Sequence, residues 1–207
     1  MISLTELLNE IGGVTYNNQV LFLSRDFIQR FKKSMGKKFK YKEFGQVPGV
    51  DAMQEEINFE FKVSVTPNTK LKGHPYSIDA GAQYDEIDMT VEYNPLVFPA
   101  AFNDFIAEVK DAIRHEMEHI AQQQKGTSKW EDRGDKPFYQ YLLLSQEIPA
   151  YIKGLNKRAK VKRITLGQAI EEYFKEYKDS FKSSGEIDVV RREWLKWAEK
   201  NLPKTKL

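Results

Sequence analysis

Residues 102–124 read FNDFIAEVKDAIRHEMEHIAQQQ, and this stretch has the pattern of one long amphipathic helix. At about 100° of rotation per residue, its apolar side chains form one stripe that can face a core: Phe102, Ile106, Val109, Ile113, Met117 and Ile120. His115 and His119 lie away from that stripe, within about 40° of each other. The stretch therefore predicts a helix from near residue 100 to about residue 124, with an apolar face and a histidine-bearing face.

Two segments before this helix alternate apolar and polar residues, as half-buried strands do. The first covers residues 57–65 and the second covers residues 87–93. The segment between them contains turn residues and has room for another short strand. We therefore expect a small antiparallel sheet, which ends at Pro95 and Pro99 before the long helix begins.

The first quarter of the chain predicts two helices and a loop. Ser3 and Glu6 have the spacing of a capping box for a short helix near the start. Residues 20–23 suit either a strand or a part of the core, and a second helix can begin at Ser24. The Lys-rich stretch that follows, up to about Gly49, contains Gly and Pro and is expected to be a loop.

The last third of the chain predicts helices and loops. Residues 138–155 form a helical segment after a polar loop, and residues 166–181 and 187–202 have amphipathic helical patterns. The expected fold class is α+β, with a small antiparallel sheet, the histidine-bearing helix and additional C-terminal helices. With 207 residues, the chain is expected to form a single domain over residues 1–207.

The composition excludes several classes of protein. Hydrophobic residues make up 41% and charged residues 30% of the chain, which is typical of a globular protein. No apolar run approaches the roughly 20 residues of a membrane-spanning helix, and the N-terminus does not resemble a secretory signal. We therefore expect a cytoplasmic protein without a membrane partner. The absence of cysteine excludes disulfides, thiolate metal ligands and a cysteine nucleophile.

Residues 115–119 read HEMEH, which places two imidazoles one helical turn apart. At that spacing both rings can reach a single ion at about 2.0–2.1 Å, a geometry that suits zinc. The simpler interpretation is a pair of exposed histidines on the polar face of the helix, which also carries Glu108, Asp111 and Gln122.

The H-E-x-x-H motif, on a helix that follows a sheet, resembles the zincin metallopeptidases. No histidine follows His119, so the longer metzincin pattern is absent. In the gluzincin branch a glutamate on a later helix completes the site, and the best match here is Glu147 in SQEIPAYI, residues 145–152. The resemblance covers about residues 85–155 and implies a minimal gluzincin, with Zn²⁺ bound by His115, His119 and Glu147.

The position of Glu147 has support from the helical pattern, but an alternative stays open. The small side chain of Ala150 would permit close approach of this helix to the HEMEH helix. Pro149 removes a helical hydrogen bond and predicts a kink, which either aims Glu147 at the metal or places the ligand elsewhere. In the second case Glu147 is a surface carboxylate. The other acids that follow His119 and could be the third ligand are Asp132, Asp135, Glu171 and Glu172.

Two glutamates flank the histidines, and helix geometry does not choose between them. A carboxylate beside a metal-activated water can accept its proton and pass it to the leaving amine. The zincin resemblance implies that Glu116 is this general base, and it leaves Glu118 as a neighbouring group that can pair with Arg114. Asp111 is expected either to orient the His115 imidazole or to be a solvated acid.

The resemblance also implies a donor for the developing oxyanion and a strand that binds substrate. Tyr151, one turn after Glu147, is the first candidate for this catalytic donor, followed by Tyr139, Tyr141 and His74. The strand at residues 87–93 resembles the zincin edge strand, which pairs with an extended substrate through backbone groups. The expected partner is therefore a protein or peptide substrate, and the sequence does not indicate an oligomeric state.

Two other functions are consistent with parts of the sequence. The first is a zinc-binding protein without peptidase activity, including a catalytically inactive zincin-like interaction module; a fourth ligand such as His74 would favour it. The second is a nucleic-acid-binding module, suggested by KGLNKRAKVKR at residues 153–163. No aromatic residue is interleaved in that run, and the net charge is only +2, so we interpret it as a solvated helix end and linker rather than a nucleic-acid site.

Overall fold

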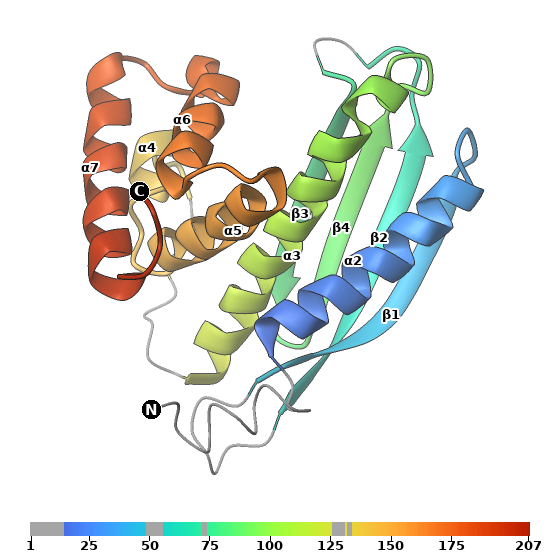
Figure 1. Cartoon of the computed structure of the whole chain (residues 1–207), viewed down its shortest axis with the longest axis horizontal. Helices are drawn as coiled ribbons and strands as arrows, with labels where there is room; N and C mark the ends of the chain where they lie inside the picture. The colour runs from blue at the N-terminus through green and yellow to red at the C-terminus, as the bar shows by residue number, and fades with distance from the viewer. Residues whose placement is uncertain (1–14, 49–55, 72–73, 126–130, 132–133) are drawn as a thin grey trace.

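The computed structural model describes residues 15–48, 56–71, 74–125, 131 and 134–207 of the chain (Figure 1). It has the expected α+β class, with a four-stranded sheet, two long helices on the sheet and a group of C-terminal helices. In chain order the elements of the first half are α2 (Tyr16–Lys33), β1 (Phe39–Val47), β2 (Ile57–Pro67), β3 (Tyr76–Gln83), β4 (Glu86–Tyr93), the 3-10 helix η1 (Phe98–Ala101) and α3 (Phe102–Lys125). The second half contains α4 (Phe138–Tyr141), α5 (Glu147–Lys162), α6 (Leu166–Glu176), the 3-10 helix η2 (Lys178–Ser180) and α7 (Ser184–Asn201).

The sheet is mixed, because it joins the expected antiparallel pairs through a parallel pair that the sequence did not predict. Its strand order is β1-β2-β4-β3. β1 pairs with β2 and β3 pairs with β4 in antiparallel register, whereas β2 and β4 lie parallel, with Phe61 opposite Ile87. The chain passes from β2 to β3 at the edge and returns through a tight turn to β4, between the two. These two reversals of direction make β4 parallel to β2.

The N-terminal region differs from the expectation at two places. The Lys-rich stretch forms β1 rather than a loop, because Phe39 and Tyr41 alternate with lysines and pack against the core. Residues 20–23 belong to α2, which begins earlier than Ser24 and has Thr15 as its N-cap. The short helix expected around Ser3 lies outside the described residues.

The first core lies between the sheet and the helices α2 and α3, which cover the same face of the sheet (Figure 1). The apolar stripe expected on α3 is confirmed, because Val109, Ile113, Met117 and Ile120 are fully buried there. A cluster of aromatic rings closes the end of this core: Phe27, Phe31, Tyr93, Phe98 and Phe105. α3 is therefore held rigidly on the sheet, with its histidine-bearing side facing away from it.

The second core is formed by α4, α5, α6 and α7 around Trp194, whose indole Nε1 donates to the Leu142 carbonyl at 3.0 Å. The helical segment expected at residues 138–155 is divided here into α4 and α5, and the two amphipathic helices after it are confirmed as α6 and α7. α5 packs along α3 and so joins the two cores (Figure 1). None of the helices in the described residues combines the length and apolar character needed to cross a membrane.

Candidate metal centre

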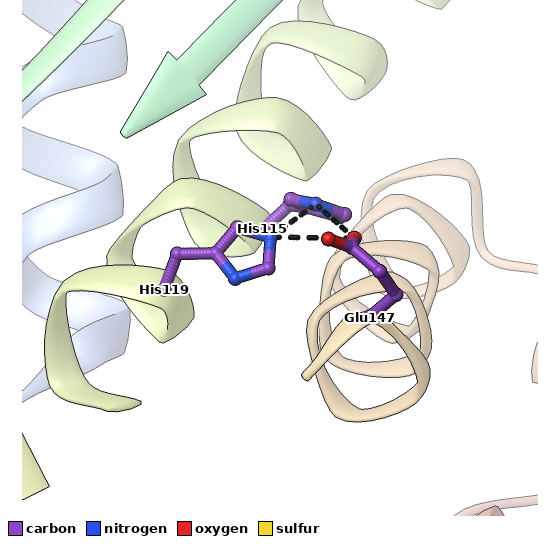
Figure 2. Close-up of side chains that lie close together, drawn as sticks. All are labelled: His115, His119 and Glu147. Atoms are coloured by element: carbon purple, nitrogen blue, oxygen red, sulfur yellow. Dashed lines mark hydrogen bonds and ion pairs between the residues drawn. The ribbon is translucent and has the colours of Figure 1, made fainter. Parts of the chain in front are cut away.

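Three side chains from α3 and α5 meet at the junction of the two cores (Figure 2). The Nε2 atoms of His115 and His119 lie 3.0 Å apart. Oε2 of Glu147 lies 3.6 Å from Nε2 of His115 and 3.4 Å from Nε2 of His119. The structure thus brings together the three residues that the sequence and the zincin resemblance predicted as metal ligands.

The donor set and its spacing fit a divalent metal ion. Bonds of about 2.0–2.1 Å in a tetrahedral site place neighbouring ligand atoms about 3.3 Å apart, close to the three distances observed. Glu147 Oε2 is buried and, among the residues that the structure describes, no donor lies within ordinary hydrogen-bond geometry of it; it faces two imidazole nitrogens at 3.4 and 3.6 Å. A bound cation would satisfy this carboxylate oxygen and both nitrogens together. The pKa of Glu147 also reflects its surroundings: burial alone would raise it, but His115 and His119 outweigh burial and lower it to about 2.

Glu147 reaches α3 because it occupies the first position of α5. Pro149 is the third residue of this helix, where backbone N–H groups have no partner within the helix, so proline removes no helical hydrogen bond. The expected kink at Pro149 is therefore wrong, and a helix start takes its place. The turn before it is closed by hydrogen bonds from the N–H groups of Glu147 and Ile148 to the Leu144 carbonyl.

The close approach of α5 to α3 depends on two small residues. Ala150 is fully buried, as its expected role requires. One turn later, Gly154 lies directly against α3: a Cβ atom there would be 2.2 Å from Oδ1 and 3.1 Å from the backbone oxygen of Asp111. Gly154 was not among the residues expected at this contact, although a glycine inside a helix indicates close packing of this kind.

The two glutamates beside the histidines have different surroundings. Glu118 pairs with Arg114 at 3.1 Å, as expected, and with Lys153 at 2.6 Å. Burial disfavours the charged form of Glu118, but the two cations outweigh it and lower its pKa. Glu116 lies on the other side, with Oε1 4.0 Å from Nε2 of His115, and burial raises its pKa.

A cavity of about 360 Å³ opens beside this cluster, between β3 and α3 on one side and α4, α5 and α6 on the other. Both His115 and Glu116 line it, whereas Glu118 does not. The Glu116 carboxylate also accepts a hydrogen bond from the backbone of Ala82 on β3. The arrangement therefore places one carboxylate and one imidazole of the H-E-x-x-H motif at the wall of a space that can hold a ligand.

Two of the predicted tyrosines line the cavity. The ring of Tyr151 lies 4.5 Å from the ring of His115 and stacks on Trp194. Burial raises the pKa of Tyr151, and its hydroxyl donates a hydrogen bond to Tyr173. Tyr141 also lines the cavity; burial raises its pKa, and a hydrogen bond to Glu147 adds to the effect.

The remaining donor candidates lie elsewhere. Tyr139 does not line the cavity, and its hydroxyl accepts a hydrogen bond from Gln140. His74 is exposed and lines a separate cavity of about 550 Å³, so it does not join the metal-binding group.

Asp111 and the downstream acids do not contact the histidines in the way the sequence suggested. Asp111 packs against Gly154, and the hydrogen bonds of the described residues include none between Asp111 and His115. Burial raises the pKa of Asp111 to about 8, although Arg158 opposes this. Among the other acids considered as third ligand, Glu171 and Glu172 form ion pairs with Arg191 and Lys162, Asp135 is exposed, and Asp132 lies outside the described residues.

The basic run at residues 153–163 is largely helix rather than linker, because α5 extends to Lys162. Several of its charges are used within the protein. Lys153 pairs with Glu118, the buried Arg158 pairs with Glu176 at 3.3 Å, and Lys162 pairs with acids on α3 and α6. These pairs give the run a structural role between α5 and its neighbours.

Comparisons of the chain with protein-family models, with curated proteins and with solved structures give no match.

Proposed function

We propose that this protein is a zinc-dependent metallopeptidase, in which His115, His119 and Glu147 bind Zn²⁺ and Glu116 is the general base. One observation carries the proposal: three metal-ligand side chains converge beside a cavity that is also lined by Glu116. Within the described residues this metal-binding group has three side chains. Catalytic zinc sites typically have three protein ligands, which leaves the fourth coordination position for water or substrate.

Zinc, when bound, acts as a Lewis acid and makes water a nucleophile near neutral pH. Glu116 would accept a proton from such a water and would deliver it to the leaving amine. Because burial raises its pKa, the Glu116 carboxyl group can hold this proton more readily than an exposed glutamate. Tyr151 stays protonated at neutral pH for the same reason and remains our first candidate for the donor to the developing oxyanion, with Tyr141 beside it.

The sheet edge next to the cavity supports a peptide as the substrate. The strand expected to pair with substrate, at residues 87–93, is β4, which lies inside the sheet between β2 and β3. The edge strand on this side is β3, and its residues Ile78, Asp79 and Ala80 line the cavity. An edge strand offers unpaired backbone groups to an extended peptide, so we assign substrate pairing to β3 in place of β4.

The test compares the zinc content and peptidase activity of the wild-type protein and Glu116→Gln. Glu199→Gln, on the exposed side of α7, is the matched control for loss of one carboxylate. We expect Glu116→Gln to retain one zinc ion per chain and to lose about 10²–10⁴-fold in peptide cleavage, because the proton acceptor is removed. The control should cleave as the wild type does.

The same assay separates the alternative of a zinc-binding protein without peptidase activity. If wild type and Glu116→Gln both bind zinc and neither cleaves a broad peptide mixture, the peptidase proposal fails and the alternative gains support. Cleavage by Glu116→Gln at the wild-type rate would contradict the role given to this residue. A site closed by His74 as a fourth ligand receives no support, since His74 lines the other cavity.

A further inference from the structure

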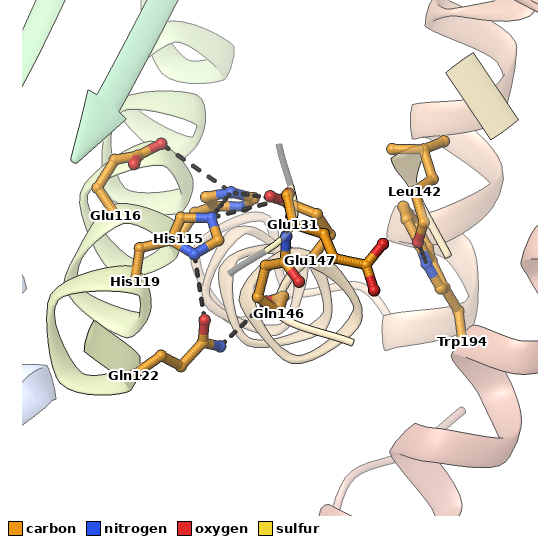
Figure 3. Close-up of polar contacts among 9 residues, drawn as sticks. All are labelled: His115, Glu116, His119, Gln122, Glu131, Leu142, Gln146, Glu147 and Trp194. Atoms are coloured by element: carbon orange, nitrogen blue, oxygen red, sulfur yellow. Dashed lines mark hydrogen bonds and ion pairs between the residues drawn. The ribbon is translucent and has the colours of Figure 1, made fainter. Parts of the chain in front are cut away.

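Gln122 connects the two helices that supply the metal ligands. It lies on α3, one helical turn after His119, and its Oε1 is 3.2 Å from Nδ1 of that histidine. Its Nε2 donates a hydrogen bond to the backbone carbonyl of Gln146 at 3.0 Å. Gln146 immediately precedes Glu147, so one amide group contacts both a histidine ligand and the chain segment that carries the carboxylate ligand (Figure 3).

These contacts define which nitrogen of His119 carries its proton. A backbone carbonyl can only accept a hydrogen bond, so the NH₂ group of Gln122 must face Gln146. The amide oxygen of Gln122 must then face His119, and an oxygen can only accept. Nδ1 of His119 is therefore the protonated nitrogen of the neutral ring. Its Nε2 keeps the lone pair, and this is the atom that lies 3.4 Å from Glu147 Oε2.

A second amide holds the same segment from the other side. Gln146 is almost fully buried, and its side-chain Nε2 donates to the backbone carbonyl of Glu131 at 2.7 Å. The segment before α5 is thus held both by Gln122 on α3 and by the backbone carbonyl of Glu131 (Figure 3). The position of Glu147 depends on this arrangement as well as on helix packing.

We propose that Gln122 is a positioning residue of the metal centre, which fixes His119 in its metal-binding tautomer and ties the backbone before Glu147 to the histidine helix. This inference rests on the proposed metal binding at His115, His119 and Glu147. Partners of this kind, which orient a ligand without touching the metal, typically contribute about 10–100-fold to metal affinity. Gln122 should contribute within that range.

The first test measures zinc affinity by competition with a chelator in Gln122→Met, which keeps the side-chain length and removes both hydrogen bonds. Gln123→Met is the matched control: Gln123 is the next residue on α3, and its Oε1 accepts a hydrogen bond from Tyr84 N at 2.7 Å instead. We expect zinc affinity to fall about 10–100-fold in Gln122→Met and to stay near the wild-type value in Gln123→Met. Equal affinities in wild type and Gln122→Met would overturn the proposal.

The second test reads the tautomer directly in the metal-free protein, by ¹⁵N NMR of the histidine rings at a pH where they are neutral. Wild type should show His119 protonated at Nδ1, and Gln122→Met should show a mixture of tautomers. Gln122→Glu separates the two connections, because a carboxylate can accept from Nδ1 but has no donor for the Gln146 carbonyl; it should keep the tautomer and still lose zinc affinity.

Wild-type His119 protonated at Nε2 would overturn the proposal whatever the zinc data show. The NMR measurement also distinguishes the two proposals. If the wild type binds no zinc, the proposed function fails, whereas the tautomer still reports on Gln122. If zinc binds and peptides are cleaved but Gln122→Met changes neither affinity nor tautomer, the role of Gln122 fails and the proposed function stands.

Discussion

α3 packs its apolar face against the sheet, whereas α5 packs among the C-terminal helices, and the candidate metal centre lies where these two helices meet. The two halves of the site are built differently. His115 and His119 are neighbours because they are four residues apart on one helix. Their spacing therefore does not depend on how the other elements pack. Glu147 reaches them through the packing of one core on the other. The histidine half should therefore respond to chemical changes in its own side chains, and the glutamate half to changes in packing.

The largest expected effect comes from removing a ligand in the histidine half. His119→Ala leaves two of the three ligand side chains, so zinc affinity should fall at least about 100-fold. His74→Ala is the matched control, since this histidine is exposed and lines the other cavity. Calorimetric titration with zinc checks both variants, and loss of binding in His74→Ala alone would break the assignment.

The next prediction distinguishes Glu118 from Glu116 by its effect on the stability of the protein rather than on its activity. Glu118→Gln leaves Arg114 and Lys153 without their buried partner, so we expect the free energy of unfolding to fall by about 3 kcal/mol. Zinc binding should persist, because Glu118 is not a ligand. Urea unfolding measures the change, with the exposed Glu199→Gln as a control expected to stay within about 0.5 kcal/mol of wild type. A stable Glu118→Gln variant would contradict this structural role.

A smaller effect on stability should follow from a substitution that pushes α5 away from α3. Gly154→Val places a Cβ atom against Oδ1 and the backbone oxygen of Asp111, and a backbone contact of 3.1 Å is not relieved by side-chain rotation. We expect a loss of about 2 kcal/mol in unfolding free energy, with weaker zinc binding as α5 moves away from α3. Gly81→Val is the control, since a Cβ at Gly81 on β3 meets no atom within 4 Å. Unchanged stability and zinc affinity in Gly154→Val would show that the glutamate half does not depend on this packing.

The smallest expected effect is a change in the pH dependence of stability. It arises from Asp111, at the same contact with Gly154. The pKa of Asp111 is about 8 in the folded protein, well above the value of an unfolded aspartate, because burial penalises its charged form. Between these two pKa values the folded state binds more protons than the unfolded state, so the contribution of Asp111 to stability is lost as pH rises toward 8.

Asp111→Asn should remove this part of the pH dependence. We expect the difference in unfolding free energy between about pH 7 and about pH 8 to shrink by on the order of 1 kcal/mol relative to wild type. Urea unfolding at the two pH values measures it. An identical pH dependence in both proteins would mean that Asp111 ionises normally.

The same contrast explains how much the sequence could predict. The HEMEH spacing, the apolar stripe of α3 and the alternation in β2 and β4 are local patterns, so they were predictable and are confirmed. β1 was missed because its lysines, which point outward, conceal the alternation of Phe39 and Tyr41. The parallel pairing of β2 with β4 depends on where β3 lies in the sheet, and no local pattern encodes that.

In the candidate metal centre, too, local patterns were predictable and contacts between distant segments were not. Glu147 was found through the zincin resemblance, and the helical pattern alone left other acids open. Pro149 was read as a kink because the start of α5 was placed too early in the chain, and a proline in the first turn has the opposite meaning. The contact between Gly154 and Asp111 and the hydrogen bonds of Gln122 link segments that only tertiary structure brings together. Sequence patterns could not predict either of them.

The most direct test of the central claim is a crystal structure of the zinc-loaded protein, with the metal located by its anomalous scattering. Our account predicts one zinc ion per chain, within about 2.0–2.2 Å of Nε2 of His115, Nε2 of His119 and a carboxylate oxygen of Glu147. An ion bound elsewhere, or one held by the two histidines while Glu147 points away, would contradict it.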